Sequence, residues 1–336
     1  MKISIAMATF NGAKYIQEQL NSFAAQTRLP DELVISDDGS RDDTLAIIEK
    51  FAQTVPFPVR CLANEGKKGF AQNFNTALMH CSGDLIFISD QDDYWLPEKI
   101  QTITDIAAQD PHHDVFMNDA ELTDSALTRT GLTIRGQIRS AGRSDHAFLL
   151  GCCIAVRESF LSWILPIPQE CRAHDNWIVE FADGLGLRRI IDQPLQLYRR
   201  HSRTTTTHDI TQPRPVNRLA SLRGRLLANI RNHTYARNLA ARKREIQLMA
   251  DRARAYRNEG EDAASSFEQF IGEMTRQGST IDVRLRLLRA ARMHRILPIT
   301  NLLLTRRYAY FRGVWTALQD FLMPKQPADG CSSSDM

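Results

Sequence analysis

Residues 1–95 alternate short apolar runs of strand type with segments of helical periodicity, and this alternation restricts the possible folds more than any other feature of the chain. The predicted strands are residues 3–8, 33–36, 58–62 and 85–89, and the predicted helices are residues 15–23, 45–51 and 70–79. Strands that alternate with helices at short intervals form a parallel sheet covered on both faces. The sequence therefore predicts an α/β fold with a mostly parallel central sheet.

A cluster of polar residues follows each of these strands. The clusters are Thr9-Phe10-Asn11-Gly12, Asp37-Asp38-Gly39-Ser40, Asn64-Glu65-Gly66 and Asp90-Gln91-Asp92-Asp93. In a parallel sheet they share one edge, the edge at which α/β proteins bind ligands. Solvated turns are also polar, so the pattern alone leaves that interpretation open. The first cluster lacks Gly-x-Gly-x-x-Gly and a Walker lysine, so it has no loop of the kind that binds phosphate directly. We therefore expect the acidic groups at the strand ends to hold phosphate through a metal ion.

The fourth cluster places three carboxylates within four positions, Asp90, Asp92 and Asp93. Carboxylates this close repel one another and hold protons at neutral pH when nothing compensates them. A hard cation such as Mg2+ or Mn2+, bound through oxygen, removes the conflict. The cluster predicts either a metal or nucleotide site or an ordinary acidic turn.

Charge is unevenly distributed along the chain. Residues 1–212 carry 20 Lys and Arg against 28 Asp and Glu, whereas residues 213–325 carry 22 against 9. The two parts are therefore expected to do different jobs. We predict a catalytic domain over 1–212, a basic helical region over 213–325 and a disordered tail over 326–336.

The cysteines and the apolar runs bear on the compartment. Six cysteines show neither a Cys-x-x-Cys pair nor zinc spacing, which indicates reduced thiols in the cytoplasm. The first eight residues are typical of a strand and not of a signal peptide. No uncharged apolar run reaches the length of about 18 residues that a membrane helix needs.

Four motifs in the first hundred residues, taken in order, resemble family 2 glycosyltransferases of the GT-A fold, especially the bacterial rhamnosyltransferase-like members. The motifs are Ala8–Gly12, Ser36–Asp42, Asn64–Gly66 with Gly69–Asn75, and Asp90–Trp95. The resemblance continues with less force to about residue 205. It implies transfer of a sugar, with inversion, from a nucleoside diphosphate sugar to a hydroxyl acceptor, with Mn2+ or Mg2+ as cofactor.

The same resemblance implies roles for individual residues. Those expected at the nucleoside or the donor are Thr9, Asn11, Asp37, Asp38 and Asn73. Asp90 would reach the ribose or the sugar, and Asp92 would bind the metal at the diphosphate. Asp93 would either assist the metal or cap the helix that begins near Pro97.

Residues 111–212 are expected to supply the base that inversion requires on the face opposite the leaving group. The acid of His174-Asp175-Asn176-Trp177 resembles the catalytic base of the family, with helix capping as the alternative for Asp175. In Tyr198-Arg199-Arg200-His201 the family pattern implies phosphate contacts for Arg199 and Arg200. It implies a metal or diphosphate contact for His201, and a surface histidine is the alternative.

Three further segments lie in this part of the chain. Asp114–Met117 predicts a strand with Asn118-Asp119 at its end. Arg135–Arg143 predicts a polar loop that either closes over the donor diphosphate or is simply solvated. Cys152 is expected near the donor sugar or in the core.

The basic C-terminal third predicts helices, because arginines recur there among Leu, Ile and Ala. Arg284–Leu297 predicts a basic amphipathic helix, followed by apolar and aromatic residues that include Tyr310 and Trp315. Two interpretations fit: a helical bundle with a solvated arginine face, or a surface that docks on anionic lipid. The second would place the protein on the inner face of the cell membrane, where a lipid-carried acceptor is reached.

The leading hypothesis is a glycosyltransferase of cell-surface polysaccharide synthesis, with dTDP-rhamnose or a UDP-hexose as donor and a lipid-linked saccharide as acceptor. A sugar-phosphate nucleotidyltransferase is the second hypothesis, although the loop after the first strand lacks the Gly-rich basic character of that class. The third is a non-enzymatic basic adaptor. The chain lacks the aromatic-rich sheet or zinc spacing of common nucleic-acid modules, so no nucleic-acid partner is expected.

Overall fold

The computed structural model describes residues 1–64, 66, 68–202, 209–218, 221, 224, 235–257, 264–311 and 313–325. The chain divides into two compact units, Met1–Arg218 and Leu219–Met336, and each is described by itself. The predicted tail 326–336 and Glu65 of the third polar cluster lie outside the described residues.

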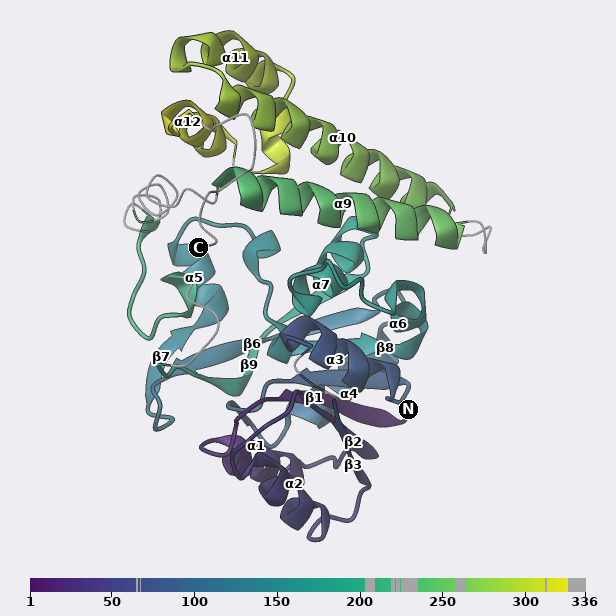
Figure 1. The fold of residues 1–336 in the computed structure, drawn as a ribbon. Helices are drawn as coiled ribbons and strands as arrows, with labels where there is room; N and C mark the ends of the chain where they lie inside the picture. Colours follow the sequence, from purple (N-terminus) through teal and green to yellow (C-terminus); the bar gives the residue numbers. More distant parts are fainter. Residues whose placement is uncertain are drawn as a thin grey trace. The chain divides into compact units, whose positions relative to one another are not determined.

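The first unit is built on a mixed sheet with the strand order β3-β2-β1-β4-β8-β6-β9-β5, and β7 pairs with β6 (Figure 1). The strands are β1 (Ile3–Thr9), β2 (Glu32–Asp37), β3 (Val59–Ala63), β4 (Leu85–Ser89), β5 (Tyr94–Trp95), β6 (Val115–Thr123), β7 (Arg129–Thr133), β8 (Ile154–Arg157) and β9 (Arg188–Arg199). The pairs of β1 with β2 and β4, of β2 with β3, and of β6 with β9 are parallel. The predicted parallel sheet is thus confirmed for β1 to β4, while antiparallel β8 separates β4 from β6.

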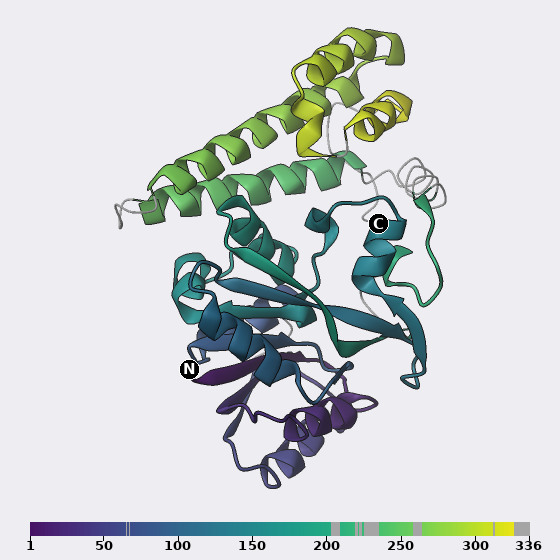
Figure 2. The ribbon, with the colours of Figure 1, turned by 180° about the vertical axis from the view of Figure 1, so that it is seen from behind.

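Helices cover both faces of this sheet, as expected. They are α1 (Ile16–Ala24), α2 (Thr44–Ala52), α3 (Phe70–Met79), α4 (Lys99–Gln109), α5 (Ile134–Ser140), α6 (Glu158–Ile164) and α7 (His174–Gly184). Alternate residues of a strand point to opposite faces, and Ile3, Ile5 and Met7 of β1 pack in one core with apolar residues of α1, α2 and α4. The opposite views in Figures 1 and 2 show α3, α6 and α7 on the other face.

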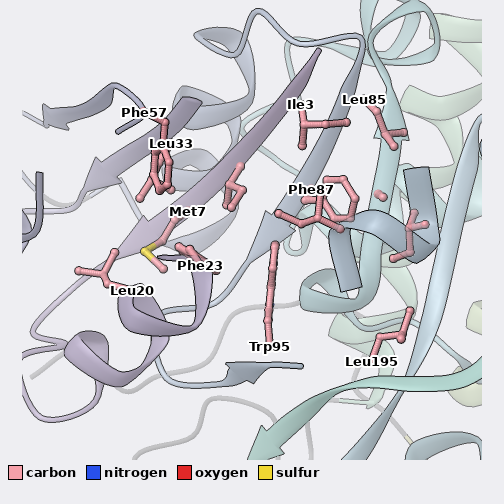
Figure 3. Close-up of a cluster of buried hydrophobic side chains, with 14 of the residues drawn as sticks. Ile3, Met7, Leu20, Phe23, Leu33, Phe57, Leu85, Phe87, Trp95 and Leu195 are labelled. Carbon is pink, nitrogen blue, oxygen red and sulfur yellow. The ribbon is translucent and has the colours of Figure 1, made fainter. Parts of the chain in front are cut away.

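Trp95 lies in this core together with Phe23 and Phe87 (Figure 3). Its ring is fully buried, with its centroid 4.7 Å from that of Phe23 and 5.8 Å from that of Phe87. Its backbone N–H donates to Ser22 Oγ at 3.2 Å. Because Trp95 stands two residues after Asp93, the end of the acidic turn is anchored in the centre of the fold.

Two predictions in this unit are wrong. Strand β6 continues to Thr123, so Asn118 and Asp119 lie buried inside the strand and not at its end. The predicted loop at Arg135–Arg143 is largely helix α5, because Ile134 and Ile138 are buried on one face and the Thr133 side chain accepts from the Gly136 N–H at 3.1 Å.

The arginines of that segment are held by acids of the protein. The Arg135 guanidinium is buried and pairs with Asp145 at 2.8 Å and with Asp192. Arg139 pairs with Asp192 at 2.7 Å, and Arg143 pairs with Asp209. The segment is therefore neither a solvated loop nor a cover over the donor.

The second unit is helical in its described residues, as predicted, with a long hairpin of two helices and a small domain of short helices at its end (Figure 1). The helices are α9 (Tyr235–Arg257), α10 (Ala264–Arg289), α11 (Ile296–Leu304) and α12 (Val314–Leu322), with 3-10 turns η4 (Arg292–Arg295) and η5 (Arg307–Tyr310). A single amphipathic helix over Arg284–Leu297 is not formed, because α10 ends at Arg289. Within the described residues, no helix combines the length and the apolarity that crossing a membrane requires.

Candidate active site at the carboxyl edge of the sheet

The loops after β1 and β2 are joined by the residues predicted at the nucleoside. Thr9 Oγ1 donates to Asp37 Oδ2 at 2.7 Å, and Asp37 Oδ1 accepts from the Ser40 N–H at 2.7 Å. Asn11 Oδ1 accepts from the Arg41 N–H at 2.8 Å. Hydrogen bonds between side chain and backbone hold a loop where the sheet alone cannot. The two loops therefore form one rigid rim.

Asp38 and Asn73 attach the third loop to this rim. The Asp38 carboxylate accepts from the N–H groups of Lys68, at 2.6 Å, and Gly69, at 2.9 Å. The Asn73 Nδ2 donates to the Thr9 carbonyl at 3.0 Å. The structure thus brings all five predicted nucleoside residues together, and among them only Asn11 is exposed.

Gln91, which the sequence did not single out, connects the acidic turn to the first loop. Its Oε1 accepts from the Phe10 N–H at 3.0 Å, and its Nε2 donates to the Phe10 carbonyl at 3.2 Å. A Cβ on Gly12 would stand 2.3 Å from Gln91 Oε1, so a larger residue there would displace the Gln91 amide. The two hydrogen bonds to Phe10 hold Gln91 against the first loop, and with it Asp90 and Asp92, its neighbours in the sequence.

Asp93 is buried and accepts hydrogen bonds from β9. Its Oδ1 accepts from the Arg199 N–H at 3.0 Å and its Oδ2 from Gln196 Nε2 at 3.4 Å. Helix α4 begins at Lys99 with Glu98 in the cap position, so Asp93 does not cap it. Burial and, after it, the neighbouring Asp92 raise the pKa of Asp93 to about 7.

Lys99, also missed from the sequence, supplies a cation beside this carboxylate. Its side chain is fully buried, and Nζ donates to the Cys152 carbonyl at 2.9 Å and to Gln196 Oε1. Nζ also lies 3.8 Å from the centroid of the Trp95 ring. Burial lowers the pKa of Lys99 to about 8. The sequence did contain a signal, because Lys99 shares the apolar face of its helix with Ile103.

One group of metal-type side chains stands out among the described residues: Asp90, Asp93 and Cys152, with ligand atoms within 4.8 Å of one another. A hydrogen bond with Cys153 and burial raise the pKa of the Cys152 thiol, and a neutral thiol is a poor ligand for Mg2+ or Mn2+. Burial, with Asp93, Asp92 and Asp175 adding to it, likewise raises the pKa of Asp90. The Cys152 thiol therefore does not suit a hard cation, whereas the Asp90 and Asp93 carboxylates are oxygen donors of the kind that Mg2+ and Mn2+ prefer.

Asp92 and His201 form a better pair for a hard or borderline cation. His201 Nε2 lies 2.8 Å from Asp92 Oδ2, and the imidazole stacks on Tyr15 with ring centroids 4.7 Å apart. Two neighbouring ligands of an octahedral ion are about 3 Å apart when each bond is about 2.1 Å. The two atoms are hydrogen-bonded to each other, and they are of the types that Mg2+ or Mn2+ binds, a carboxylate oxygen and an imidazole nitrogen.

Arg199 holds the backbone of Asp92 in place by a hydrogen bond to its carbonyl. Its guanidinium is buried, donates to the carbonyls of Asp92 at 2.7 Å and Ser125 at 2.8 Å, and pairs with Glu18. Its Cζ lies 4.6 Å from the centroid of the Tyr15 ring. Arg200 follows it, with Cζ 5.8 Å from the Tyr198 ring.

Asp175 lies in the first turn of α7 and is not the helix cap, a position that Ala173 occupies. Burial raises the pKa of Asp175 to about 6, and the Asp175 carboxylate adds, as a lesser cause, to the rise in the pKa of Asp90. The preceding His174 stacks on Phe74 with centroids 3.9 Å apart. A Cβ on Gly151 would come within 2.4 Å of His174 Nε2, so the start of α7 is tightly held.

Residues 4–159 match the family model described as Glycosyl transferase family 2. The chain is 29% identical over 239 residues to the dTDP-rhamnosyl transferase RfbG of Shigella flexneri, which covers 65% of this chain and 80% of RfbG. It is 28% identical to an uncharacterized glycosyltransferase of Nostoc sp. over 60% of this chain and 65% of that protein. A third relative is the poly(ribitol-phosphate) beta-N-acetylglucosaminyltransferase TarS of Staphylococcus aureus, 39% identical over 35% of this chain and 20% of TarS.

A likeness in structure extends further along the chain. The crystal structure of S. aureus TarS residues 1–349 in complex with UDP aligns with 96% of this chain and 89% of its own, with a TM-score of 0.52 and 17% identity. At that identity the likeness concerns the fold alone. The GT-A fold expected from the motifs, with additional C-terminal helices, is confirmed.

Proposed function

We propose that this chain, whose residues 4–159 match the family described as Glycosyl transferase family 2, is a glycosyltransferase that transfers one sugar, with inversion, from a nucleoside diphosphate sugar to a saccharide hydroxyl. The observation that supports this most is a half-buried carboxyl group, Asp175 in the first turn of α7, whose pKa is raised to about 6 by burial. The nucleotidyltransferase and adaptor hypotheses are set aside, because the family transfers glycosyl groups.

In this proposal the rim formed by Thr9, Asn11, Asp37, Asp38 and Asn73 receives the nucleoside. Asn11, the exposed member, contacts it directly, while the buried members keep the loops in place. Asp90, directly after β4, accepts a hydrogen bond from a ribose or sugar hydroxyl.

Asp92 and His201 would hold Mg2+ or Mn2+, and an imidazole ligand favours Mn2+. The ion, when bound, neutralises charge that develops on the leaving diphosphate. We assign Asp93 and Arg199 to positioning, because both are buried and bonded to the backbone or side chains of the same loop. Arg200, adjacent to His201, is the remaining candidate for a phosphate contact.

Asp175 would take the proton of the acceptor hydroxyl as the sugar is transferred. A carboxylate of ordinary acidity is a weak base, and burial raises the pKa of Asp175 toward the range where a base works well near neutral pH. Its position on α7, across from the acidic turn, allows donor and acceptor to be bound from different elements.

The identity of the donor is supported only by relatives. RfbG is named a dTDP-rhamnosyl transferase and is matched over most of its length, which favours dTDP-rhamnose; TarS is named an N-acetylglucosaminyltransferase, which keeps a UDP-hexose open. We propose a lipid-linked saccharide as acceptor, polysaccharide synthesis as the process, and the cytoplasmic face of the cell membrane as the location.

A nucleotide-release screen tests the proposal. The full chain is incubated with dTDP-rhamnose, UDP-glucose and UDP-N-acetylglucosamine, each with Mn2+, Mg2+ or EDTA. One donor should release its nucleoside diphosphate with a divalent ion and not with EDTA. Release that EDTA leaves unchanged would overturn the metal assignment, and failure of every donor to bind or react would overturn the proposed donor class.

A further inference from the structure

The second unit carries a concentration of exposed apolar side chains. Seven of the thirteen exposed large hydrophobic side chains among the described residues lie within residues 293–318. They are Met293, Ile296, Leu297, Leu304, Val314, Trp315 and Leu318, and we call them the α11–α12 surface. Leu297 is 82% exposed and Leu304 80%. Single exposed hydrophobic residues are ordinary, but a gathering of them marks a site of interaction.

These side chains are not needed to fill the core of the unit. Helices α11 and α12 lie side by side at the end of α10 (Figures 1 and 2), and their inner residues Ile299, Leu302 and Ala317 pack with Leu287 and Tyr308. Helix α11 contains no charged residue at all. Because apolar residues also lie on the outer face, both helices are apolar on two sides. An apolar helix face of this kind is not stabilised by contact with water.

The single acid near this surface is withdrawn from solvent. Asp320 of α12 is fully buried, where its carboxylate accepts from Arg284 Nε at 2.7 Å, from the Tyr308 hydroxyl at 2.9 Å and from the Tyr235 hydroxyl at 2.8 Å. Arg284 therefore belongs to the interior and not to the solvated arginine face predicted from the sequence.

Cations border the surface. Residues 285–325 contain eight Lys and Arg and one acid, Asp320. Arg295 is buried and donates to main-chain carbonyls, but other basic residues of the segment are exposed. The exposed ones in the described part are Arg286, Arg289, Arg292, Arg306, Arg307 and Lys325. In the described part of residues 285–325, apolar helix faces are thus combined with a border of positive charge, and the one acid, Asp320, is buried.

We propose that the α11–α12 surface docks the protein on an anionic lipid bilayer. Leu297, Leu304 and Trp315 would enter the headgroup region, and the bordering arginines would contact lipid phosphates. An anionic bilayer both buries the apolar side chains and binds the arginines. The inference rests on the proposed function only for the reason why the protein docks, which is to reach a lipid-linked acceptor. Membrane binding itself is measured without sugar transfer.

A second copy of the chain fits the surface less well. A two-fold dimer brings the same patch of both subunits together, so the arginine border would meet arginines and not acids. Protein interfaces are also depleted of charged residues at their centre. Among the described residues 285–325, no exposed acid is available to pair with the arginine border of a second copy. Charge complementarity therefore favours lipid.

The test is sedimentation of the full chain with vesicles of phosphatidylcholine, with and without phosphatidylglycerol. We expect binding to the anionic vesicles that falls between about 0.1 M and about 1 M salt, as the Debye length falls from about 10 Å to about 3 Å. Trp315 fluorescence should shift to the blue on binding, because the other three tryptophans are already buried or half-buried.

Two double variants separate the apolar and ionic contributions. The first double variant is Leu297→Ser with Leu304→Ser, and the second is Arg306→Glu with Arg307→Glu. Each should weaken partitioning onto anionic vesicles at least about tenfold. In the second variant each arginine contributes a factor of about five or more. The matched control is Leu45→Ser with Lys50→Glu on exposed positions of α2, which should bind as the unmodified chain does.

Three results would overturn the inference: equal binding to neutral and anionic vesicles, unchanged binding in both double variants, or a dimer in sedimentation velocity that the leucine variant abolishes while no vesicle is bound. Nucleotide release is measured on the same samples. Release without vesicle binding removes only the membrane inference, and vesicle binding without release removes only the proposed function.

Discussion

At the scale of single residues, a buried lysine of the same chain is linked to the acidic turn through Gln196, which accepts from Lys99 Nζ and donates to Asp93 Oδ2 at 3.4 Å. Lys99 is fully buried beside Asp93, whereas the sequence alone pointed to a metal as the means of relieving repulsion. A buried charge that loses its partner is strongly destabilising. The structural and the catalytic cation are therefore separate groups.

Replacing Lys99 should reveal that structural role. Lys99→Met keeps the length of the side chain and removes its charge, so the free energy of unfolding in urea should fall by about 3–5 kcal/mol. Lys50→Met, at an exposed position of α2, should change it by less than about 0.5 kcal/mol. Equal stability of the two variants would show that the turn needs no internal cation.

Asp175 should determine the pH dependence of transfer. Its pKa is raised from 3.8 to about 6, so the carboxyl group is protonated below that pH and cannot accept a proton. We expect kcat/KM to rise about tenfold per pH unit below pH 6 and to level above it. Asp175→Asn should lower kcat by about 10²–10⁴-fold with donor binding unchanged.

Asp105→Asn, at an exposed position of α4, is the control and should behave as the unmodified enzyme. If Asp175→Asn weakened donor binding as much as turnover, Asp175 would belong to the donor site and not to the transfer step.

Asp92 and Asp93 should separate under metal titration. Asp92→Asn removes a proposed ligand, and we expect Mn2+ affinity, measured by calorimetry with a nucleoside diphosphate present, to fall at least about tenfold. Asp93→Asn should leave that affinity within about twofold and lower stability instead, because the new Nδ2 donor would replace Oδ2, which accepts from Gln196 Nε2. A loss of Mn2+ affinity in Asp93→Asn equal to that in Asp92→Asn would return Asp93 to the metal site.

At the scale of elements, local pattern was sufficient for the half of the sheet that carries the polar clusters. The predicted helix at residues 70–79 is α3, whose start is set by Gly69 at φ 84°, a conformation that favours glycine. Apolar runs, helical periodicity and turn residues agree with one another there. All four polar clusters consequently lie at the expected edge.

The rest depended on partners distant in sequence. Helix α5 is stabilised by Arg135 pairing with Asp192, and the α10 arginine Arg284 is buried by Asp320, 36 residues away. Neither pairing leaves a mark in periodicity, so arginines of both segments were interpreted as solvent-exposed. The contact of Lys99 with Cys152 and Gln196 is equally invisible to a local pattern.

The contact between Gly151 and α7 can be tested by one methyl group. In Gly151→Ala the new Cβ meets His174, which cannot retreat because it stacks on Phe74. The first turn of α7 must shift and carry Asp175 with it, so kcat should fall at least about tenfold while donor KM stays within about twofold. Gly272→Ala in α10, where nothing obstructs a Cβ, should leave both unchanged. Normal turnover in Gly151→Ala would show that α7 tolerates the shift.

At the scale of the whole molecule, the two units have separate cores, and their stabilities should respond separately. The core of the second unit surrounds the Arg284–Asp320 pair, with Arg284 4% and Asp320 0% exposed. Arg284→Met leaves the Asp320 carboxylate buried and unpaired. We expect calorimetry of the full chain to show one transition weakened by about 3–5 kcal/mol and another unchanged.

Lys243→Met is the matched control, because Lys243 pairs with Asp282 at 2.7 Å in the same unit but on its surface. Such exposed pairs contribute about 0–1 kcal/mol. Nucleotide release at room temperature should persist in both variants. A single transition that shifts as a whole in Arg284→Met would show that the units unfold together.

Because of Lys99, we expect folding of the protein to be independent of bound divalent ions. In many small metal-binding domains the ion is part of the folded structure, and chelators unfold them. Here a buried lysine of the chain itself is linked to the acidic turn through Gln196, so we expect removal of divalent ions to leave a folded protein ready for reloading. Mg2+, Mn2+ or another ion can then be exchanged in one preparation, and the ion that supports turnover is decided by availability and ligand preference at Asp92 and His201.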